Sequence, residues 1–559
     1  MKKKLLILLL ALVAIATTAK AQVVLNETNF PDANFRAALA SILGISEGDE
    51  ISEAKIAATI SLDVNSKPIA DLTGIEYFTA LTALRCYRNQ LTSLDVSKNT
   101  KLTSLFCYMN QLTSLDVSKN TKLTGLRCDG NQLTALDVSK NTALKELNCL
   151  GNQLTSLDVS KNTALTTLWC DDNQLTSLDV SKNTALTKLG CDNNQLTALD
   201  VSKNTKLTYL SCSSNQLTSL DVSKNTKLTS LFCYMNQLTA LDVSKNTALT
   251  ELSCDNNQLT SLDVSKNTEL TLLLCDDNQL TSLDVSKNTA LIFLHCGYNQ
   301  LTSLDVSGCS ALFRLYCDNN QLNSLDVTGC TALKYLFCDN NQLNSLDVSG
   351  CTALVTLWCF NNQLTLLNVS GCTALTTLMC DNNQLTSLDV SKNTALTTLW
   401  CFNNQLTLLN VSGCTALTSL NCFSNKLTAL DVSKNTALEY LSCTNNQIKG
   451  KEMDALVASL PTVESSNFYV IDTKNENEGN VCTKAQVAVA KGKGWTVYDN
   501  NGGSEQEYEG SDDTTAIDAS LNDNGKMIND NYYSIDGVKL SGEPTKKGVY
   551  IHKGKKVKK

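Results

Sequence analysis

The sequence predicts an all-β-dominated solenoid, in which a 21-residue turn is repeated along one axis. Three observations lead to this fold class. Cysteine recurs every 21 residues from Cys86 to Cys443, which gives 18 cysteines without an insertion or deletion. Asparagine stands three residues after each of them, from Asn89 to Asn446. A strict period of this length is typical of repeats that bury their apolar sides only against neighbouring repeats.

The first half of each turn is predicted to be a short strand of a parallel sheet. The spacing L-x-x-L-x-L-x-x-N-x-L of a leucine-rich repeat is filled by Leu81, Leu84, Cys86, Asn89 and Leu91, with cysteine in the third apolar position. Successive side chains of a strand point to opposite faces, so Leu84 and Cys86 face the core. The residues that alternate with them face outward.

The cysteine and asparagine columns are predicted to be structural ladders. A buried corner leaves backbone groups without partners, and an asparagine amide both donates and accepts hydrogen bonds. Cysteines in one inward column have parallel Cα–Cβ vectors, which suit a disulfide poorly. They also do not converge on one point, as zinc or an iron–sulfur cluster would require. We therefore expect reduced cysteines that pack as small apolar side chains, with no metal and no cofactor. The residues that represent these ladders are Cys86, Cys107, Cys254, Cys443, Asn89 and Asn110.

The second half of each turn repeats the pattern of the first. LTALRCYRNQ (81–90) and LTSLDVSKNT (91–100) share the spacing L-T-x-L-x-φ-x-x-N, where φ is apolar. Each turn then has two extended segments, which form either two parallel sheets or one sheet with an extended back. From residue 309 to residue 414 the second corner changes from SKNT to SGCT or TGCT, and we expect the new thiols to donate to carbonyls. These cysteines are Cys309, Cys330, Cys351, Cys372 and Cys414.

Two charged rows follow the second segment. Aspartate recurs from Asp95 to Asp431, and lysine recurs from Lys98 to Lys287. Calcium binding is one interpretation of the aspartate row, but calcium needs six to eight oxygens around one ion. Because each turn offers one carboxylate beside a lysine, we interpret these rows as a solvated, charge-balanced face.

The N-terminal residues 1–21 are predicted to be a secretory signal peptide. Lysines at 2–4 precede the apolar stretch 5–16 and the small-residue cleavage sequence Ala19-Lys20-Ala21. That stretch is too short to cross a bilayer, and we expect no transmembrane span elsewhere. We expect an exported protein that is secreted or lies on the bacterial cell surface, outside the outer membrane.

Both open ends of the solenoid are predicted to be covered. A helix is expected within 30–44, where Pro31-Asp32 gives a start signal. At the other end we expect helices at 449–460 and 482–494, with Cys482 buried in the second helix, and strands at 468–472 and 495–499. The predicted organisation is a signal peptide (1–21), an N-terminal cap (22–59), the leucine-rich repeat solenoid (60–446), an α/β C-terminal cap (447–499), an acidic flexible linker (500–531) and a short β-like C-terminal module (532–559).

Two segments resemble known families. IADLTGIEYFTALTAL (69–84) resembles an internalin-type repeat, and the 21-residue unit with its cysteine column is similar to the cysteine-ladder, internalin J-like family. This resemblance implies a surface-exposed bacterial protein that binds something on a host or neighbouring cell. The segment 532–559 resembles the sorting tails of type IX secretion, through IDGVKL (535–540), the strand Gly548-Val549-Tyr550-Ile551 and the lysine-rich end. This second resemblance implies a route to the outer surface.

The composition argues against several functions. A net charge of −9 disfavours nucleic acid, which needs a basic face. The two histidines, His295 and His552, stand far apart, and no phosphate loop or metalloprotease motif is present, so we expect no enzyme activity.

We therefore predict a secreted or cell-surface binding module of the adhesion type, which binds a protein or glycan on a host or neighbouring cell surface and acts as a monomer. The alternative is a structural spacer or surface-layer rod without a specific ligand. Outward positions of the later strands are rich in aromatic residues, which usually mark interaction surfaces. The candidate ligand-binding residues are Phe293, Tyr298, Tyr316, Tyr335, Phe337, Trp358, Phe360, Trp400, Phe402 and Phe423.

Overall fold

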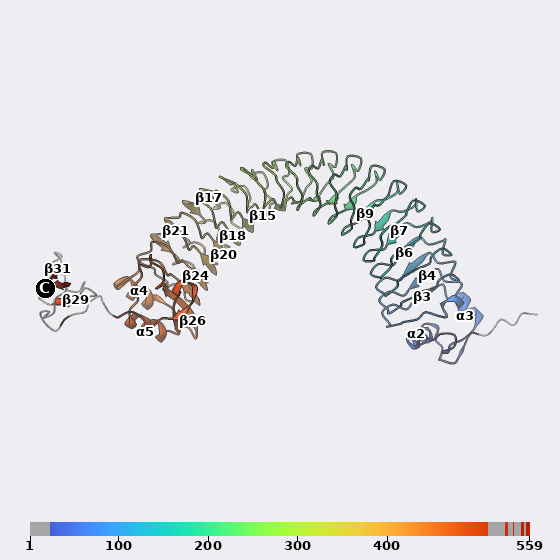
Figure 1. Cartoon of the computed structure of the whole chain (residues 1–559), viewed down its shortest axis with the longest axis horizontal. Coiled ribbons are helices and arrows are strands. Elements are labelled where there is room, and N and C mark those ends of the chain that lie inside the picture. Colours follow the sequence, from blue (N-terminus) through green and yellow to red (C-terminus); the bar gives the residue numbers. More distant parts are fainter. Residues whose placement is uncertain (1–22, 513–531, 535–539, 541–548, 553–554, 559) are drawn as a thin grey trace, which may run out of the picture. The chain divides into compact units, whose positions relative to one another are not determined.

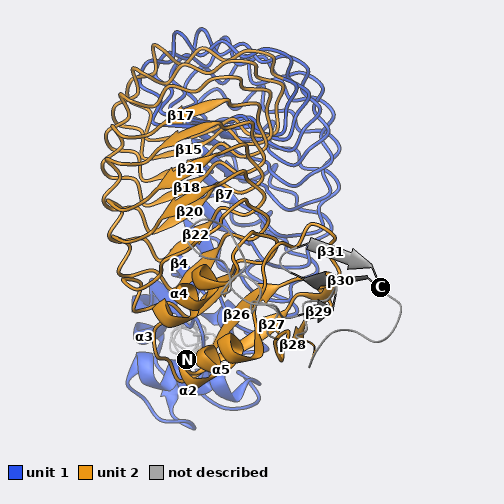
Figure 2. Ribbon diagram, turned by 90° about the vertical axis from the view of Figure 1, so that its left-hand side faces the viewer, with its two compact units in different colours: residues 1–279 blue, residues 280–559 orange. Residues whose placement is uncertain are grey.

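The computed structural model describes residues 23–512, 532–534, 540, 549–552 and 555–558. Two compact units divide the chain, residues 1–279 (unit 1) and residues 280–559 (unit 2), shown in different colours in Figure 2. Each unit contains a stretch of solenoid, as the sequence predicts. The predicted signal peptide lies outside the described residues.

Unit 1 begins with the N-terminal cap and continues as a parallel sheet. Strands β3 to β13 pair in chain order, each in register with the next, so that Leu84 lies beside Leu105 and Leu105 beside Leu126. The elements of unit 1 are β1 (Val23–Val24), α2 (Ala33–Leu43), β2 (Glu50–Ile51), α3 (Glu53–Ala58), β3 (Ser61–Asp63), the 3-10 turn η1 (Ile75–Tyr77), β4 (Ala83–Arg85), β5 (Ser104–Phe106), β6 (Gly125–Arg127), β7 (Glu146–Asn148), β8 (Thr167–Trp169), β9 (Lys188–Gly190), β10 (Tyr209–Ser211), β11 (Ser230–Phe232), β12 (Glu251–Ser253) and β13 (Leu272–Leu274).

Unit 2 carries one long parallel sheet and two short strand pairs on its back (Figure 1). The long sheet runs β14-β15-β16-β18-β20-β22-β24-β25 and continues into β26 and β27 of the C-terminal cap. The strands of the solenoid are β14 (Phe293–His295), β15 (Arg314–Tyr316), β16 (Tyr335–Phe337), β17 (Ser345–Asp347), β18 (Thr356–Trp358), β19 (Leu366–Asn368), β20 (Thr377–Met379), β21 (Ser387–Asp389), β22 (Thr398–Trp400), β23 (Leu408–Asn410), β24 (Ser419–Asn421) and β25 (Tyr440–Ser442).

The C-terminal part of unit 2 contains the cap and a separate small sheet. Cap elements are α4 (Lys451–Ser459), β26 (Ser466–Ile471), α5 (Lys484–Gly492), β27 (Trp495–Asp499), the 3-10 turn η2 (Asn501–Gly503) and β28 (Gln506–Glu507), which pairs antiparallel with β27. The small sheet consists of β29 (Tyr532–Ser534), β30 (Val549–His552) and β31 (Lys555–Lys558), all antiparallel. Residues 535–539 of the IDGVKL segment lie outside the described residues.

Two sequence signals for the caps have clear outcomes. Asp32 begins α2, since its carboxylate accepts the backbone N–H of Phe35 at 2.8 Å, and Gly44 ends the helix in the left-handed conformation at φ 61°. The expectation that Cys482 lies within the second C-terminal helix is wrong. Thr483 is the N-cap residue of α5, where its hydroxyl and the Gln486 side chain form a capping box, so Cys482 stands just before the helix, still buried.

The first asparagine ladder satisfies the backbone at the buried corner, as expected. The Oδ1 atom of Asn110 accepts the backbone N–H of Leu91 at 3.0 Å. Its Nδ2 group donates to the carbonyls of Cys86 and Cys107, each at 3.0 Å, which ties one turn to the preceding one. The residue before each ladder asparagine has a positive φ, for example 52° at Met109, because the chain reverses direction there.

The cysteine column packs as predicted. All 24 cysteines are buried free thiols. Burial raises the pKa of Cys107 to about 12 and that of Cys422 to about 12, so the reactive thiolate is disfavoured at neutral pH. The additional cysteines at the second corner donate as expected, for example from Cys330 Sγ to the Val306 carbonyl at 3.4 Å and from Cys372 Sγ to the Val348 carbonyl at 3.1 Å.

The aspartate row on the back has a local structural role. The carboxylate of Asp95 accepts the backbone N–H of Ser97 at 2.8 Å, and Asp116 accepts that of Ser118 in the same way. These hydrogen bonds lower the pKa of both carboxyl groups, because they stabilise the ionised form. The row therefore fixes the turn that precedes the second corner, in keeping with the interpretation as a solvated face.

Candidate binding face

The outward face of the long sheet in unit 2 is formed by the residues on either side of each buried strand leucine. On β14 these residues are Phe293 and His295, and on β16 they are Tyr335 and Phe337. The central leucine of each strand is fully buried, whereas most of its neighbours are half-buried. Because strand register is exact from turn to turn, equivalent side chains stand beside one another in rows.

Five of the ten predicted residues and His295 form one continuous group of aromatic rings. The ring centroids of Phe293 and Tyr316 lie 5.5 Å apart, and those of His295 and Tyr316 lie 4.9 Å apart. Tyr316 stacks on Phe337 at 4.5 Å with nearly parallel planes, and Phe337 meets Trp358 edge-on at 4.7 Å. The ring of Phe360 lies 6.2 Å from that of Trp358 and ends the group. Its predicted members are Phe293, Tyr316, Phe337, Trp358 and Phe360. Tyr335 joins the group through Arg314, which is described below.

A second group lies two strands further along the same sheet. Trp400 and Phe402 have centroids 6.3 Å apart, and Phe402 stacks on Phe423 at 4.5 Å. The register places Met379 between Trp358 and Trp400, so the row of side chains stays apolar across the interval. Trp400 is 37% exposed. The predicted residue Tyr298 stands at the corner after β14, away from this row, and is 53% exposed.

Arg314 adds a cation that sequence reasoning missed. Its guanidinium carbon lies 4.9 Å from the ring centroid of Tyr335 and 5.9 Å from that of Phe293. Phe313, also missed, packs against Tyr335 at 5.6 Å. Arg314 could have been recognised as a candidate from the sequence, because it occupies an outward strand position between two turns with aromatic residues. Arginine stacks readily on aromatic faces.

The position after the ladder cysteine, which holds Phe360, Phe402 and Phe423 in three turns of unit 2, holds aspartate in others. Burial and the neighbouring Asp318 raise the pKa of Asp339 to about 6, and burial raises that of Asp381. In unit 1 the same position holds Asp171, whose pKa burial raises to about 6. The printed sequence repeats this aspartate in eight turns, which would have revealed the row: Asp129, Asp171, Asp192, Asp255, Asp276, Asp318, Asp339 and Asp381.

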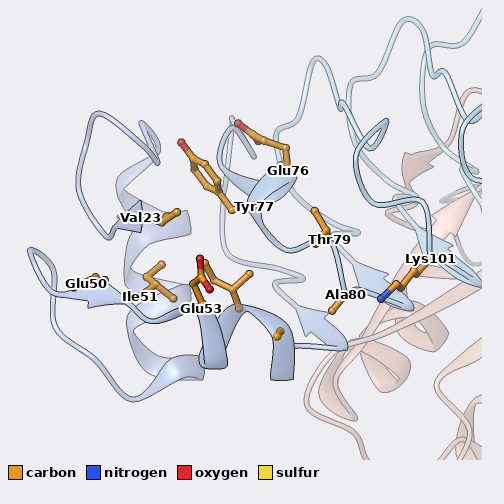
Figure 3. A pocket seen from close by; sticks show the side chains of 11 residues that line it. Val23, Glu50, Ile51, Glu53, Glu76, Tyr77, Thr79, Ala80 and Lys101 are labelled. Atoms are coloured by element: carbon orange, nitrogen blue, oxygen red, sulfur yellow. The ribbon is translucent and has the colours of Figure 1, made fainter. Parts of the chain in front are cut away.

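In the described part of the chain, no group of three or more histidine, cysteine, aspartate or glutamate side chains is placed to hold a metal ion. No helix of that part is long and apolar enough to cross a membrane. A hollow of about 720 Å³ lies in unit 1 beside the N-terminal cap, where Ile51, Tyr77 and Lys101 contribute to its wall (Figure 3). None of its lining residues belongs to the aromatic face.

Comparisons with known proteins agree with the observed repeats. No family model matches the chain. Internalin J of Listeria monocytogenes serotype 4b (strain F2365) is 46% identical over 71 residues, which is 13% of this chain and 8% of internalin J. The chain thus matches less than a tenth of that relative. The solved functional domain of internalin J, described as including a cysteine ladder, is 36% identical, with 79% of this chain and 81% of that chain covered and a TM-score of 0.47.

Two further solved structures share the fold. An internalin (inlF) from Listeria monocytogenes is 25% identical, with 62% of this chain and 98% of that chain covered and a TM-score of 0.50. A leucine-rich repeat protein of Leptospira interrogans is 23% identical, with 63% and 92% covered and a TM-score of 0.52. The fold, the repeat spacing and these likenesses define the chain as a leucine-rich repeat protein. Within that class it is internalin-like, with a cysteine ladder in its core.

Proposed function

We propose that this chain is a protein-binding module of the adhesion type, and that the aromatic face of unit 2 is its binding surface. The observation that carries the proposal is the continuous, half-buried row from Phe293 to Trp358, which is stacked, held in register and flanked by Arg314. Aromatic and arginine side chains contribute most of the binding energy in protein interfaces. Their fixed orientation lowers the entropy that is lost when a partner binds.

A glycan is the second kind of partner that fits the face. Trp400 leaves part of its ring exposed, and flat aromatic faces stack on sugar rings. We favour a protein because the pairs Tyr316–Phe337 and Phe402–Phe423 already stack on one another, which leaves mainly ring edges and Arg314 for contact. The structural alternative, a spacer without a ligand, explains the stacking by sheet stability alone, at about 0.2–1 kcal/mol per pair.

A double variant separates binding from stability. In Trp358→Ala with Trp400→Ala, binding to surface extracts of host or neighbouring bacterial cells should fall at least tenfold, while the melting temperature changes little. Trp169→Ala is the matched control, since Trp169 occupies the equivalent outward position on β8 in unit 1 and should leave binding unchanged. Unchanged binding in the double variant, with a clear drop in its melting temperature, would make the row part of the scaffold.

We also propose that the protein reaches the bacterial surface or the medium. The proposal is supported by the predicted signal peptide and by the resemblance of 532–559 to type IX sorting tails. Deletion of 532–559 should leave the protein in the periplasm of a host that has this secretion route, as cell fractionation would show. Normal surface display of the shortened protein would exclude a sorting role for the tail, while leaving the binding face untested by that experiment.

A further inference from the structure

A second surface of different chemistry lies on β4 to β6 in unit 1. Its residues, which we name the arginine patch, are Arg85, Tyr87, Arg88, Phe106, Tyr108, Met109 and Arg127. The chain contains only five arginines among its 46 basic residues. Three of them belong to this patch, and a fourth, Arg314, belongs to the aromatic face of unit 2. Arginine is thus used almost entirely on outward aromatic surfaces, whereas lysine supplies the remaining positive charge.

Two guanidinium groups enclose one phenylalanine ring in this patch. The register places Arg85, Phe106 and Arg127 side by side on three successive strands. The guanidinium carbons of Arg85 and Arg127 each lie 5.9 Å from the ring centroid of Phe106. Arg127 also lies 4.6 Å from the ring centroid of Tyr108, which stacks on Tyr87 at 4.3 Å with nearly parallel planes. Arg85 and Arg127 therefore lie against ring faces in the absence of a ligand.

The arginines keep donor capacity for a ligand. The side chain of Arg127 is 35% exposed, and its Nε lies 3.5 Å from one carboxylate oxygen of Asp129. Burial raises the pKa of the Asp129 carboxyl group, and the neighbouring Arg127 opposes this shift. Arg88 is exposed at the corner and Arg85 is half-buried, and neither forms an ion pair within the described ranges. A guanidinium that is stacked on a ring still presents its N–H groups at the edge, in a geometry that matches a carboxylate.

The aromatic rings of the patch favour an acidic peptide over an acidic sugar. Phe106 has a guanidinium on either side, and Tyr87 and Tyr108 cover one another, so little open ring face is left on which a sugar could stack. Met109, which is 50% exposed, adds a flexible apolar contact of the kind that adapts to peptide side chains. Arg85 and Arg127 stand two strand spacings apart, about 9–10 Å. Residues three apart in a polyproline II peptide are spaced by about 9 Å.

We propose that the arginine patch binds an extended acidic peptide segment of a partner protein, through carboxylates three residues apart that pair with Arg85 and Arg127. This inference does not depend on the aromatic face of unit 2. An acid at each end of a Pro-Pro spacer places the two carboxylates at the required separation and holds the peptide extended.

The test uses fluorescence polarisation with the full chain and a labelled peptide, Glu-Pro-Pro-Glu-Pro-Pro-Glu. Binding should be at least tenfold tighter than for Gln-Pro-Pro-Gln-Pro-Pro-Gln, and it should weaken with added salt. In Arg85→Gln with Arg127→Gln, binding of the acidic peptide should fall at least tenfold. Arg127→Lys, which keeps the charge but loses the stacked fork, should weaken it threefold or more.

Two controls make the outcome decisive. Lys188→Gln removes an exposed positive charge from β9 on the same sheet face and should change binding less than twofold. Circular dichroism melting curves confirm that each variant is folded. Equal losses for Lys188→Gln and the arginine pair would show general charge attraction and overturn the proposal. Tighter binding of trigalacturonate than of the acidic peptide would overturn it in favour of an acidic glycan.

Discussion

Turns with lysine at the second corner and turns with glycine there differ in how closely their backs approach. In unit 1 the corner reads SKNT, and the back segments of the described turns form no strands. In unit 2, where glycine replaces lysine in most turns, β17 pairs with β19, and β21, from the turn of Lys392, pairs with β23 of the following glycine turn. A Cβ atom at Gly371 or Gly413 would overlap the carbonyl oxygen of Ser349 or Ser391, respectively.

The position of Lys392 supports this explanation. It is the one lysine within the run of glycine corners that follows Gly308, and it stands in the turn of β21. Within the described residues, no pairing joins β19 to β21, although pairs exist on both sides of this interval. Lysine has a Cβ that needs room, so the lysine corner keeps neighbouring backs apart. In both strand pairs on the described back, the later turn has glycine at this corner, so the missing Cβ lets two neighbouring turns approach closely.

The largest expected effect comes from restoring lysine at a glycine corner. Gly371→Lys should destabilise the protein by about 2–3 kcal/mol, because its Cβ would force the backs of two turns apart. The shift in the midpoint of guanidinium chloride denaturation measures this change. Lys392→Gly is the matched control and should alter the stability by less than about 1 kcal/mol. Equal effects of the two substitutions would mean that the glycine corners are not close-packed.

The second corner also differs in its hydrogen bonds. Asn162 donates from Nδ2 to the carbonyls of Val138 and Asn141, each at 2.9 Å, while its own buried Oδ1 has no partner within the described residues. Cys351 donates once, to the Val327 carbonyl at 3.3 Å. Its side chain has no amide oxygen that would need a hydrogen-bond donor. Asparagine thus gives two good hydrogen bonds at the expense of one buried, unpaired oxygen. Cysteine gives one weaker bond without that cost.

A smaller effect follows from exchanging the two corner residues. Asn162→Ala should lower the stability by about 1–3 kcal/mol, because two buried carbonyls lose their donor. Asn162→Cys should recover most of this loss, since the thiol reaches one carbonyl and the unpaired oxygen is removed. Denaturation midpoints of the two variants provide the comparison. A cysteine variant as unstable as the alanine variant would show that the two corner residues are not interchangeable in this fold.

The fold was largely predictable because the spacing of residues within the repeat determines it. Leu84, Cys86 and Asn89 each perform one role that spacing reveals, and every copy repeats the information. The form of the back was not predictable, since pairing there depends on whether a single Cβ fits against a carbonyl, as at Gly371. The candidate faces were partly predictable. Aromatic residues are visible in the sequence, but Arg314 and the arginine patch become sites only when three strands lie in register.

The central claim is that the cysteine column is a packed scaffold on which the outward faces vary. Thiol titration with Ellman's reagent, without reductant and on protein purified from an oxidising compartment, tests this claim most directly. The account predicts no reaction in the native state, where all 24 thiols are buried, and close to 24 free thiols in denaturant. A count far below 24 in denaturant would contradict it, because the missing thiols would be paired in disulfides.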